Sequence, residues 1–118
     1  MKSVLIVDDD PAFRRLASRI VASLGLAVVG EAGTVAAALE AAAELQPGAA
    51  LVDVGLPDGD GVTLAAQLVA LPCSPRVVLT STDSDAVTSA TAQRVGAIGF
   101  LPKSDLTDAS LRGMFTGF

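Results

Sequence analysis

Three aspartates, Asp8, Asp9 and Asp10, follow directly after the apolar run of residues 4–7. Carboxylates at such close range repel one another by about 1 kcal/mol per pair even near a wet surface. Asp10 stands in front of Pro11, and an aspartate before a proline is a usual helix start, so we assign Asp10 to capping. Asp8 and Asp9 lack such an explanation, and a pair of carboxylates is a candidate ligand set for a hard cation.

The alternative explanation for Asp8 and Asp9 is that one of them also caps the helix or forms an ion pair. Arg14 and Arg15 lie a few residues further along the chain, and either of them would neutralise one carboxylate. Such a pair accounts for one acid and leaves the other. The two aspartates together are therefore better explained by a bound cation.

Other polar residues follow further apolar runs. Asp53 ends the run that starts at residue 49, Thr80 and Ser81 follow residues 77–79, and Lys103 follows shortly after residues 98–101. If these runs are parallel strands, their carboxyl ends meet at one edge of the sheet, where ligands of such sheets bind. We therefore expect three carboxylates, a hydroxyl and an amine to converge at that edge.

The charges of this group indicate which cation it takes. Asp8, Asp9 and Asp53 carry three negative charges, and Lys103 returns one positive charge, so a divalent ion supplies what is missing. Mg²⁺ prefers oxygen ligands and is usually held by one or two carboxylates together with a phosphate. A lysine ammonium binds phosphate as a point charge, although most lysines are simply solvated at the surface.

A phosphoryl group bound among these residues would explain why carboxylates, a hydroxyl and an amine occur together. Phosphoryl transfer depends mainly on positioning and on neutralising the charge of the moving oxygens. A carboxylate serves as acceptor and becomes an aspartyl phosphate. We expect Asp53 to be the acceptor, because Asp8 and Asp9 form a metal-holding pair, and Ser81 to donate to a phosphoryl oxygen. The alternative for Ser81 is a hydroxyl that caps the following helix.

Composition excludes several other classes of site. The chain has 118 residues, which suits a single domain, and it contains one cysteine, Cys73, and no histidine. Disulfide frameworks, zinc sites and histidine-based catalysis are thereby excluded. A net charge of −5 argues against direct contact with nucleic acid phosphates. No stretch has the composition of a membrane span or a secretion signal, so we expect a cytoplasmic protein without membrane contact.

Apolar runs alternate with helical patterns along the whole chain. Continuous aliphatic runs are typical of buried parallel strands, and apolar residues at i, i+3 and i+4 are typical of helices. The alternation predicts an α/β fold with a parallel sheet covered by helices on both faces. The expected strands are 4–7, 26–29, 49–52, 77–79 and 98–101, and the expected helices are 11–24, 35–45, 62–71, 85–95 and 106–114.

The motifs "VLIVDDDP", "LVDVGLPDGDG", "VVLTS" and "VGAIGFLPKSDL", in this order, resemble the receiver domain of bacterial two-component response regulators. The spacings from Asp9 to Asp53 and from Ser81 to Lys103 are also similar to those of receivers. The resemblance implies one receiver domain over residues 1–118, either alone or part of a longer regulator. It implies a flavodoxin-like (βα)5 three-layer sandwich with strand order 2-1-3-4-5. "GFLPKSDL" is more similar to receivers joined to LuxR/FixJ-type DNA-binding domains than to the commonest receiver pattern.

The same resemblance implies roles for individual residues. Asp53 would accept a phosphoryl group from the phosphohistidine of a sensor histidine kinase or from a small donor such as acetyl phosphate. Mg²⁺ would be bound by Asp8, Asp9, Asp53 and the carbonyl oxygen of Gly55. Lys103 and Ser81 would hold the phosphoryl oxygens. Such a domain is not a classical enzyme, but it catalyses its own phosphorylation and dephosphorylation.

The resemblance also implies a switch that carries the signal onward. On phosphorylation the Ser81 hydroxyl would shift and the aromatic side chain of Phe100 would turn inward, although Phe100 also suits a core position. The surface formed by the fourth helix, the fifth strand and the fifth helix would then repack and control an output domain or effector. The sequence leaves open whether phosphorylation also produces a homodimer. Thr88, Ser89 and Thr91 are poor helix formers, which favours a fourth helix that shifts easily.

Two other classes of function compete with this interpretation. A haloacid-dehalogenase-type phosphatase would use Asp8 as nucleophile and Asp10 as general acid and base, but it would leave Asp53 without a role and lacks a downstream acidic pair. A receiver-like binding module would never take phosphate. A flavin carrier is disfavoured, because the acids after the first strand would repel the flavin phosphate.

Overall fold

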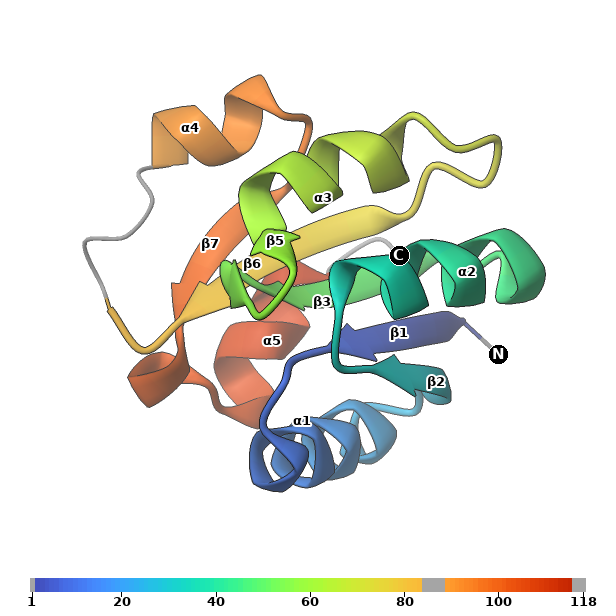
Figure 1. Cartoon of the computed structure of the whole chain (residues 1–118). Coiled ribbons are helices and arrows are strands. Elements are labelled where there is room, and N and C mark those ends of the chain that lie inside the picture. The colour runs from blue at the N-terminus through green and yellow to red at the C-terminus, as the bar shows by residue number, and fades with distance from the viewer. Residues whose placement is uncertain (1, 84–88, 116–118) are drawn as a thin grey trace.

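A five-stranded parallel sheet forms the centre of the computed structural model, which describes residues 2–83 and 89–115. Its strands lie in the order β2-β1-β3-β6-β7 (Figure 1), which is 2-1-3-4-5 when only the strands of this sheet are counted. The predicted flavodoxin-like order is therefore confirmed. The strands are β1 (Ser3–Val7), β2 (Ala27–Ala32), β3 (Ala49–Asp53), β6 (Arg76–Ser81) and β7 (Gly99–Pro102).

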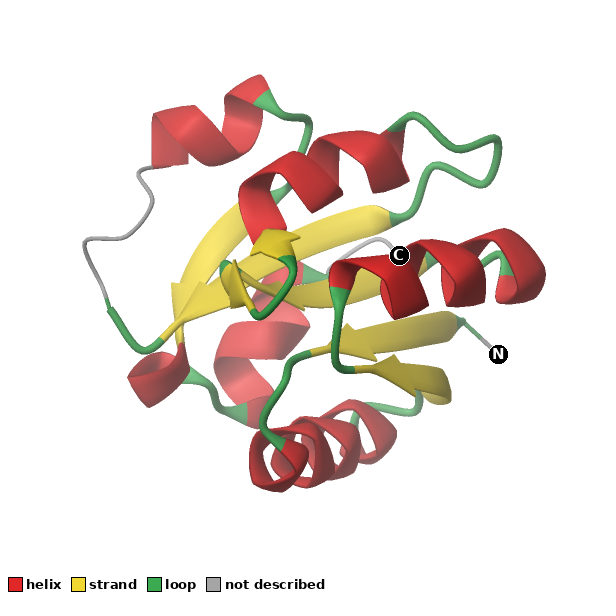
Figure 2. Cartoon of the chain, in the orientation of Figure 1, coloured by secondary structure: helices red, strands yellow, loops and turns green. Residues whose placement is uncertain are grey.

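Helices cover both faces of the sheet and give the predicted three layers. One face carries α1 and α5, and the other carries α2, α3 and α4 (Figure 1). Figure 2 shows that helices and strands alternate along the chain. The helices are α1 (Pro11–Ser23), α2 (Val35–Leu45), α3 (Gly61–Val69), α4 (Ser89–Arg94) and α5 (Asp108–Met114).

Two hydrophobic clusters fill the spaces between the sheet and its helices. Successive side chains of a strand point to opposite faces, so each strand contributes to both clusters. In β1, Val4 and Ile6 pack toward α1 and α5, whereas Leu5 and Val7 pack toward the other three helices. All four side chains are at most 1% exposed, as expected for a continuous aliphatic run in a parallel strand.

Several boundaries differ from those expected from the sequence. The fourth strand of the sheet continues through Ser81, so that hydroxyl lies inside the strand and not after it. The final helix begins at Asp108, later than expected, because a short 3₁₀ turn, η1 (Lys103–Asp105), directly follows β7. An antiparallel pair, β4 (Gly55–Leu56) and β5 (Gly59–Asp60), was not expected.

The fourth helix is only partly covered by the structure. It was expected over residues 85–95, and the described part is Ser89–Arg94. Thr88, one of its poor helix formers, lies outside the described residues. The expected ease of movement of this helix stays a prediction. No helix in the described ranges has the length and apolar character that crossing a membrane requires.

Aspartate side chains accept hydrogen bonds from the first turns of α1 and α2, near the carboxyl ends of the strands. The backbone N–H of Ala12 donates to Asp10 Oδ1 over 2.9 Å, which confirms the capping role assigned to Asp10. Asp58, in the turn between β4 and β5, accepts from the N–H groups of Val35 and Ala36 over 2.7 and 3.1 Å. These two hydrogen bonds lower the pKa of Asp58 and tie the loop after β3 to the start of α2.

Helix α3 begins in direct contact with the backbone of Asp53. The N–H of Gly61 donates to the carbonyl oxygen of Val54 over 2.7 Å. A Cβ atom on Gly61 would overlap the carbonyl oxygen of Asp53 and lie 2.8 Å from its carbonyl carbon. Because backbone atoms cannot yield as a flexible side chain can, only glycine fits here without moving Asp53. This requirement was not recognised in the sequence, where Gly61 stands out only as a turn residue.

The close approach of Gly61 leads to a stability prediction. We expect Gly61→Ala to lower the free energy of unfolding by about 1–3 kcal/mol, the usual cost of forcing extra atoms into a packed site. Gly113→Ala is the matched control, because a Cβ on Gly113 in α5 meets no other atom within 4 Å. That variant should be neutral or slightly stabilising, since alanine favours helix over glycine. Urea unfolding of both variants measures the difference, and equal midpoints would contradict the prediction.

Candidate functional site

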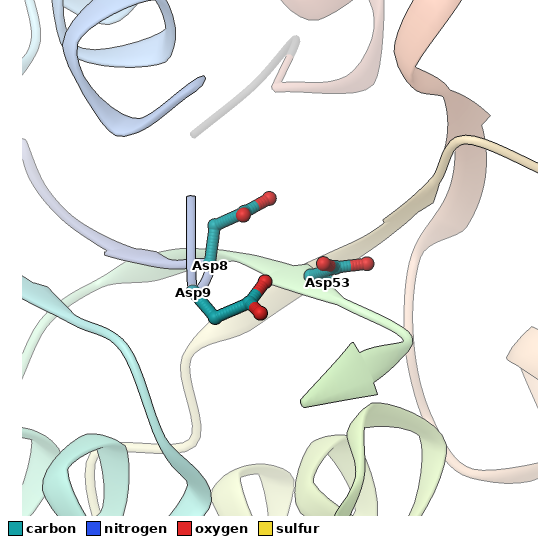
Figure 3. A group of neighbouring side chains, drawn as sticks. All are labelled: Asp8, Asp9 and Asp53. Atoms are coloured by element: carbon teal, nitrogen blue, oxygen red, sulfur yellow. The ribbon is translucent and has the colours of Figure 1, made fainter. Parts of the chain in front are cut away.

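The three acids predicted to meet do so at the carboxyl ends of two adjacent strands. Asp8 and Asp9 follow β1, and Asp53 is the last residue of β3, which pairs directly with β1 through Val7 and Val52. Figure 3 shows the side chains of Asp8 and Asp9 extending toward the side on which Asp53 lies. One carboxylate oxygen from each residue lies within 4.8 Å of the others. The structure thus confirms the clustering, although Asp53 is distant in sequence from the other two acids.

The acids differ in exposure to water. Asp8 is fully buried and Asp53 is 7% exposed, whereas Asp9 is exposed. A buried carboxylate is stable only when it is paired and hydrogen-bonded. Asp8 meets this condition, because its Oδ1 accepts from the N–H of Asp10 over 2.8 Å and its Oδ2 lies 2.6 Å from Nζ of Lys103.

Lys103 is the cation at the centre of the group. Its Nζ lies 2.6 Å from Asp8 Oδ2 and 3.3 Å from Asp53 Oδ2, and its side chain is only 14% exposed. Burial opposes the charge of Lys103, but the hydrogen bond and charge of Asp8, with those of Asp53, outweigh it and raise the pKa of Lys103 above its usual value. This lysine is therefore a structural part of the acidic group and not a solvated surface residue.

The electrostatic surroundings of Asp53 disfavour its charge. Burial raises the pKa of Asp53, and the nearby charge of Asp8 raises it further. Lys103 and a hydrogen bond from the N–H of Gly55, 3.3 Å from Asp53 Oδ1, act in the opposite direction but do not cancel the increase. The contact of Gly55 runs through its N–H, and the expected role of its carbonyl oxygen as a metal ligand stays a prediction.

Two hydroxyl groups end β6, and they point to opposite faces of the sheet. Thr80 is fully buried, and its Oγ1 donates over a long 3.5 Å to the carbonyl oxygen of Val52. Ser81 is 8% exposed, and its Oγ accepts from the N–H of Asp83 over 3.0 Å. The alternative expected for Ser81, a hydroxyl that supports the turn after the strand, is therefore present. Its proposed contact with a phosphoryl oxygen stays a prediction.

Phe100 occupies a position that suits both of its expected roles. It lies opposite Leu79 in the pairing of β6 with β7 and packs against the cluster under α2, α3 and α4. By the alternation of β6, Ser81 shares the face of Leu79. Ser81 and Phe100 thus belong to the same face of the sheet, and Phe100 is partly buried there.

Arg14 supports the site in a way that the sequence did not reveal. Its Nη1 donates to the carbonyl oxygen of Asp8 over 2.6 Å, and its Nε donates to Glu31 Oε1 over 3.0 Å. The expected alternative, neutralisation of an Asp8 or Asp9 carboxylate by this arginine, is therefore wrong for Arg14. The guanidinium instead joins the loop after β1 to the end of β2. The only sequence signal was the position of Glu31 at the end of the second strand.

The arrangement fits a hard divalent cation and an anionic ligand together. Three carboxylates lie close together against one partly buried ammonium, which leaves an excess of negative charge. Carboxylate oxygens without nitrogen or sulfur ligands suit Mg²⁺ or Ca²⁺ and not zinc or copper. Lys103 supplies a donor to a second, anionic group beside Asp53.

Comparison with known proteins agrees with this geometry. The family described as "Response regulator receiver domain" matches residues 4–113. The DNA-binding transcriptional activator DevR/DosR of Mycobacterium tuberculosis is 39% identical over 105 residues, which are 87% of this chain and 48% of that protein. A protein-glutamate methylesterase/protein-glutamine glutaminase of Hahella chejuensis is 36% identical over 102 residues, which are 85% of this chain and 29% of that protein.

Solved structures show the same fold. The signal receiver domain of NarL from Mycobacterium tuberculosis has a TM-score of 0.82 and 35% identity and covers 98% of this chain and 97% of its own. A Burkholderia pseudomallei response regulator, solved with a phosphorylated aspartic acid, a calcium ion and citrate, has a TM-score of 0.85 and 26% identity and covers 98% of this chain and 68% of its own.

The chain spans about half the length of the curated relatives it matches, or less. The match to the family nevertheless covers almost all of the chain, from the first strand into the last helix. With the strand order and the acidic site at the expected edge of the sheet, it shows that this chain belongs to the response regulator receiver domain family.

Proposed function

We propose that this domain receives a phosphoryl group on Asp53 in a Mg²⁺-dependent phosphorelay. The donor is the phosphohistidine of a sensor histidine kinase or a small molecule such as acetyl phosphate. The observation that carries the proposal is the position of Lys103, a partly buried ammonium held between Asp8 and Asp53 with the carboxylate of Asp9 close by. Receiver domains as a family are phosphorylated by sensor kinases, and the family membership of this chain supports the proposal.

The transfer step uses Asp53 as nucleophile. A carboxylate oxygen of Asp53 forms a bond to phosphorus, while the bond from phosphorus to the donor nitrogen or oxygen breaks and the leaving group keeps the electron pair. Lys103, already 3.3 Å from Asp53 Oδ2, would neutralise negative charge on the phosphoryl oxygens. The Ser81 hydroxyl can donate to a phosphoryl oxygen while it accepts from Asp83, because a hydroxyl does both at once.

Asp8, Asp9 and Asp53 would hold the metal ion, with the carbonyl oxygen of Gly55 as a further ligand. Their donor oxygens already lie within 4.8 Å of one another, so the residues fit the ion without rearrangement of the strands. Bound Mg²⁺ supplies positive charge that offsets the negative charge of the carboxylates and of the transferred group.

Geometry disfavours the phosphatase alternative. That mechanism needs Asp8 as nucleophile, but Asp8 is fully buried, and its two oxygens contact the N–H of Asp10 and the ammonium of Lys103. It also needs Asp10 as general acid and base, but the carboxylate of Asp10 caps α1. Asp53, at the edge of the sheet, is the better acceptor.

The remaining parts of the proposal concern what lies outside this domain. We propose that residues 1–118 form a single receiver domain that acts in the cytoplasm. Phosphorylation would move Ser81 and Phe100 and repack the α4-β7-α5 surface, which would control an output domain or form a homodimer. Relatives include a DNA-binding transcriptional activator and methylesterases, and these support an output domain in the same regulator. Its DNA contacts would be made by that output domain.

Acceptance of the phosphoryl group is tested by intact-mass analysis after incubation with acetyl phosphate and MgCl₂. The wild-type protein should gain the mass of one phosphoryl group, and Asp53→Asn should gain none, because it lacks the nucleophilic oxygen. Asp8→Asn should slow the reaction without moving the modified residue. Labelling of Asp53→Asn with no labelling of Asp8→Asn would favour the phosphatase. No labelling of the wild type under any of these conditions would favour the binding module.

The raised pKa of Asp53 predicts how stability depends on pH. The pKa of Asp53 in the folded protein lies above the unfolded value of 3.8, so the folded protein stays protonated at Asp53 up to a higher pH than the unfolded chain. The free energy of unfolding therefore falls as pH rises from 3.8 through the folded pKa. Asp53→Asn, which stays neutral, should therefore unfold at a higher urea concentration than wild type at pH 7. The advantage should shrink as pH falls through that interval toward 3.8 and be absent below it.

Asp58→Asn is the control of opposite sign. Hydrogen bonds from Val35 and Ala36 lower the pKa of Asp58, so its charge stabilises the fold above pH 3.8 and this contribution is lost as pH falls through the lower folded pKa. Removal of the charge should destabilise the protein at pH 7 and have little effect in strong acid. If the unfolding midpoint of each variant differed from that of the wild type by the same amount at every pH, both predictions would be contradicted.

Asp9 provides a test of metal binding that leaves the buried ion pairs in place. Asp9→Asn should weaken Mg²⁺ binding by about tenfold or more, since even residues that only support a ligand change affinity by that factor. It should also raise the melting temperature slightly without metal, because it removes repulsion from Asp8 and Asp53. Calorimetric titration with MgCl₂ measures the affinity. Glu44→Gln, an exposed acid on α2, is the control and should leave it unchanged.

A further inference from the structure

An aromatic ring lies against the ammonium of Lys103. Phe13 stands in the first turn of α1, and the centroid of its ring is 4.4 Å from Lys103 Nζ. A cation within about 6 Å of a ring is attracted by the negative face of its π system. The attraction is stronger where water is excluded, and here Phe13 is only 9% exposed and the lysine side chain 14% exposed.

The ring is a third contact of the ammonium, in addition to the two carboxylates. An ammonium has three N–H donors, and the carboxylates of Asp8 and Asp53 lie 2.6 and 3.3 Å from Nζ. These carboxylates come from the ends of β1 and β3, whereas Phe13 comes from α1. The position of Lys103 is thus defined by contacts from three separate elements.

Phe13 is also a core residue, as its spacing along α1 predicts. It packs in the cluster under α1 and α5 together with Val21 and Leu111. An aliphatic side chain would fill that core position as well. It would not attract a cation, so the ring has a consequence for Lys103 that packing alone does not explain.

We propose that Phe13 is a positioning residue for phosphoryl-group binding, whose ring holds the Lys103 ammonium beside Asp53. The inference rests on the proposed function of Lys103. Once Asp8 and Asp53 share their charge with a metal ion, their pull on Lys103 weakens, whereas the attraction of the ring stays the same. The ring therefore keeps the Lys103 ammonium within reach of the phosphoryl oxygens when Asp8 and Asp53 also bind the metal ion.

Site-specific fluorination of Phe13 separates this role from packing. Replacement of Phe13 by mono-, di- and trifluorophenylalanine weakens the ring quadrupole step by step and changes the size of the ring little. The probe is beryllofluoride, which imitates the phosphoryl group, titrated at saturating MgCl₂. We expect affinity to fall along the series, by about fivefold for the trifluoro ring, which corresponds to about 1 kcal/mol.

An NMR measurement reports the contact itself. The side-chain methylene signals of Lys103 should be shifted upfield by the ring current in the wild-type protein and should move toward ordinary values in Phe13→Leu. The matched control is Val21→Ala, a loss of volume in the same core cluster two turns further along α1. It should lower the stability to urea while beryllofluoride affinity and the Lys103 signals stay unchanged.

The outcomes distinguish this inference from the function on which it rests. If wild-type protein binds beryllofluoride and the fluorinated series shows equal affinities, Phe13 is a core residue only and the inference is overturned. Lys103 signals that do not respond to Phe13→Leu overturn it as well. If the wild-type protein binds no beryllofluoride with Mg²⁺, the proposed function itself fails, and the inference fails with it.

Discussion

The site depends on one partly buried ammonium shared by two buried carboxylates. Lys103 lies 2.6 Å from Asp8 and 3.3 Å from Asp53, and it balances only one of the two charges. Removal of the Lys103 ammonium would leave both carboxylates without a compensating charge, which is strongly unfavourable in a site with little water. With Asp9 added, the group keeps an excess of negative charge. Burial raises the pKa of Asp53, and the nearby charge of Asp8 raises it further. The same excess suits the group to a divalent cation.

The surrounding backbone is fixed by contacts that do not involve the charges themselves. Arg14 holds the carbonyl oxygen of Asp8, Gly61 allows α3 to begin against the backbone of Asp53, and Asp58 fastens the following loop to α2. The contacts of Arg14 and Gly61 each close a short loop at the site, whereas that of Asp58 joins segments distant in sequence. Repelling groups stay close together only when the structure around them resists their separation, and these contacts supply that resistance.

The site is connected to both layers of helices through the alternation of side chains along the strands. Phe13 connects Lys103 to the core under α1 and α5, whereas Phe100 packs under α2, α3 and α4 on the face that Ser81 shares. A change in the charge around Asp53 therefore reaches side chains packed on either face of the sheet. This arrangement would give a physical route from the proposed phosphorylation site to the surface of the domain.

The sequence by itself determined the elements with strong local patterns: the aliphatic strands, the helix start at Asp10, and the polar residues at the strand ends. These follow from periodicity and from chemistry between neighbouring residues, whereas the strand order came from the family resemblance. Only the tertiary structure decided that Arg14 pairs with Glu31 and not with an acid of the site, that Gly61 must lack a side chain, and that Phe13 faces Lys103. Such contacts depend on how separate segments pack in space, and the spacing of residues within one segment does not predict that packing.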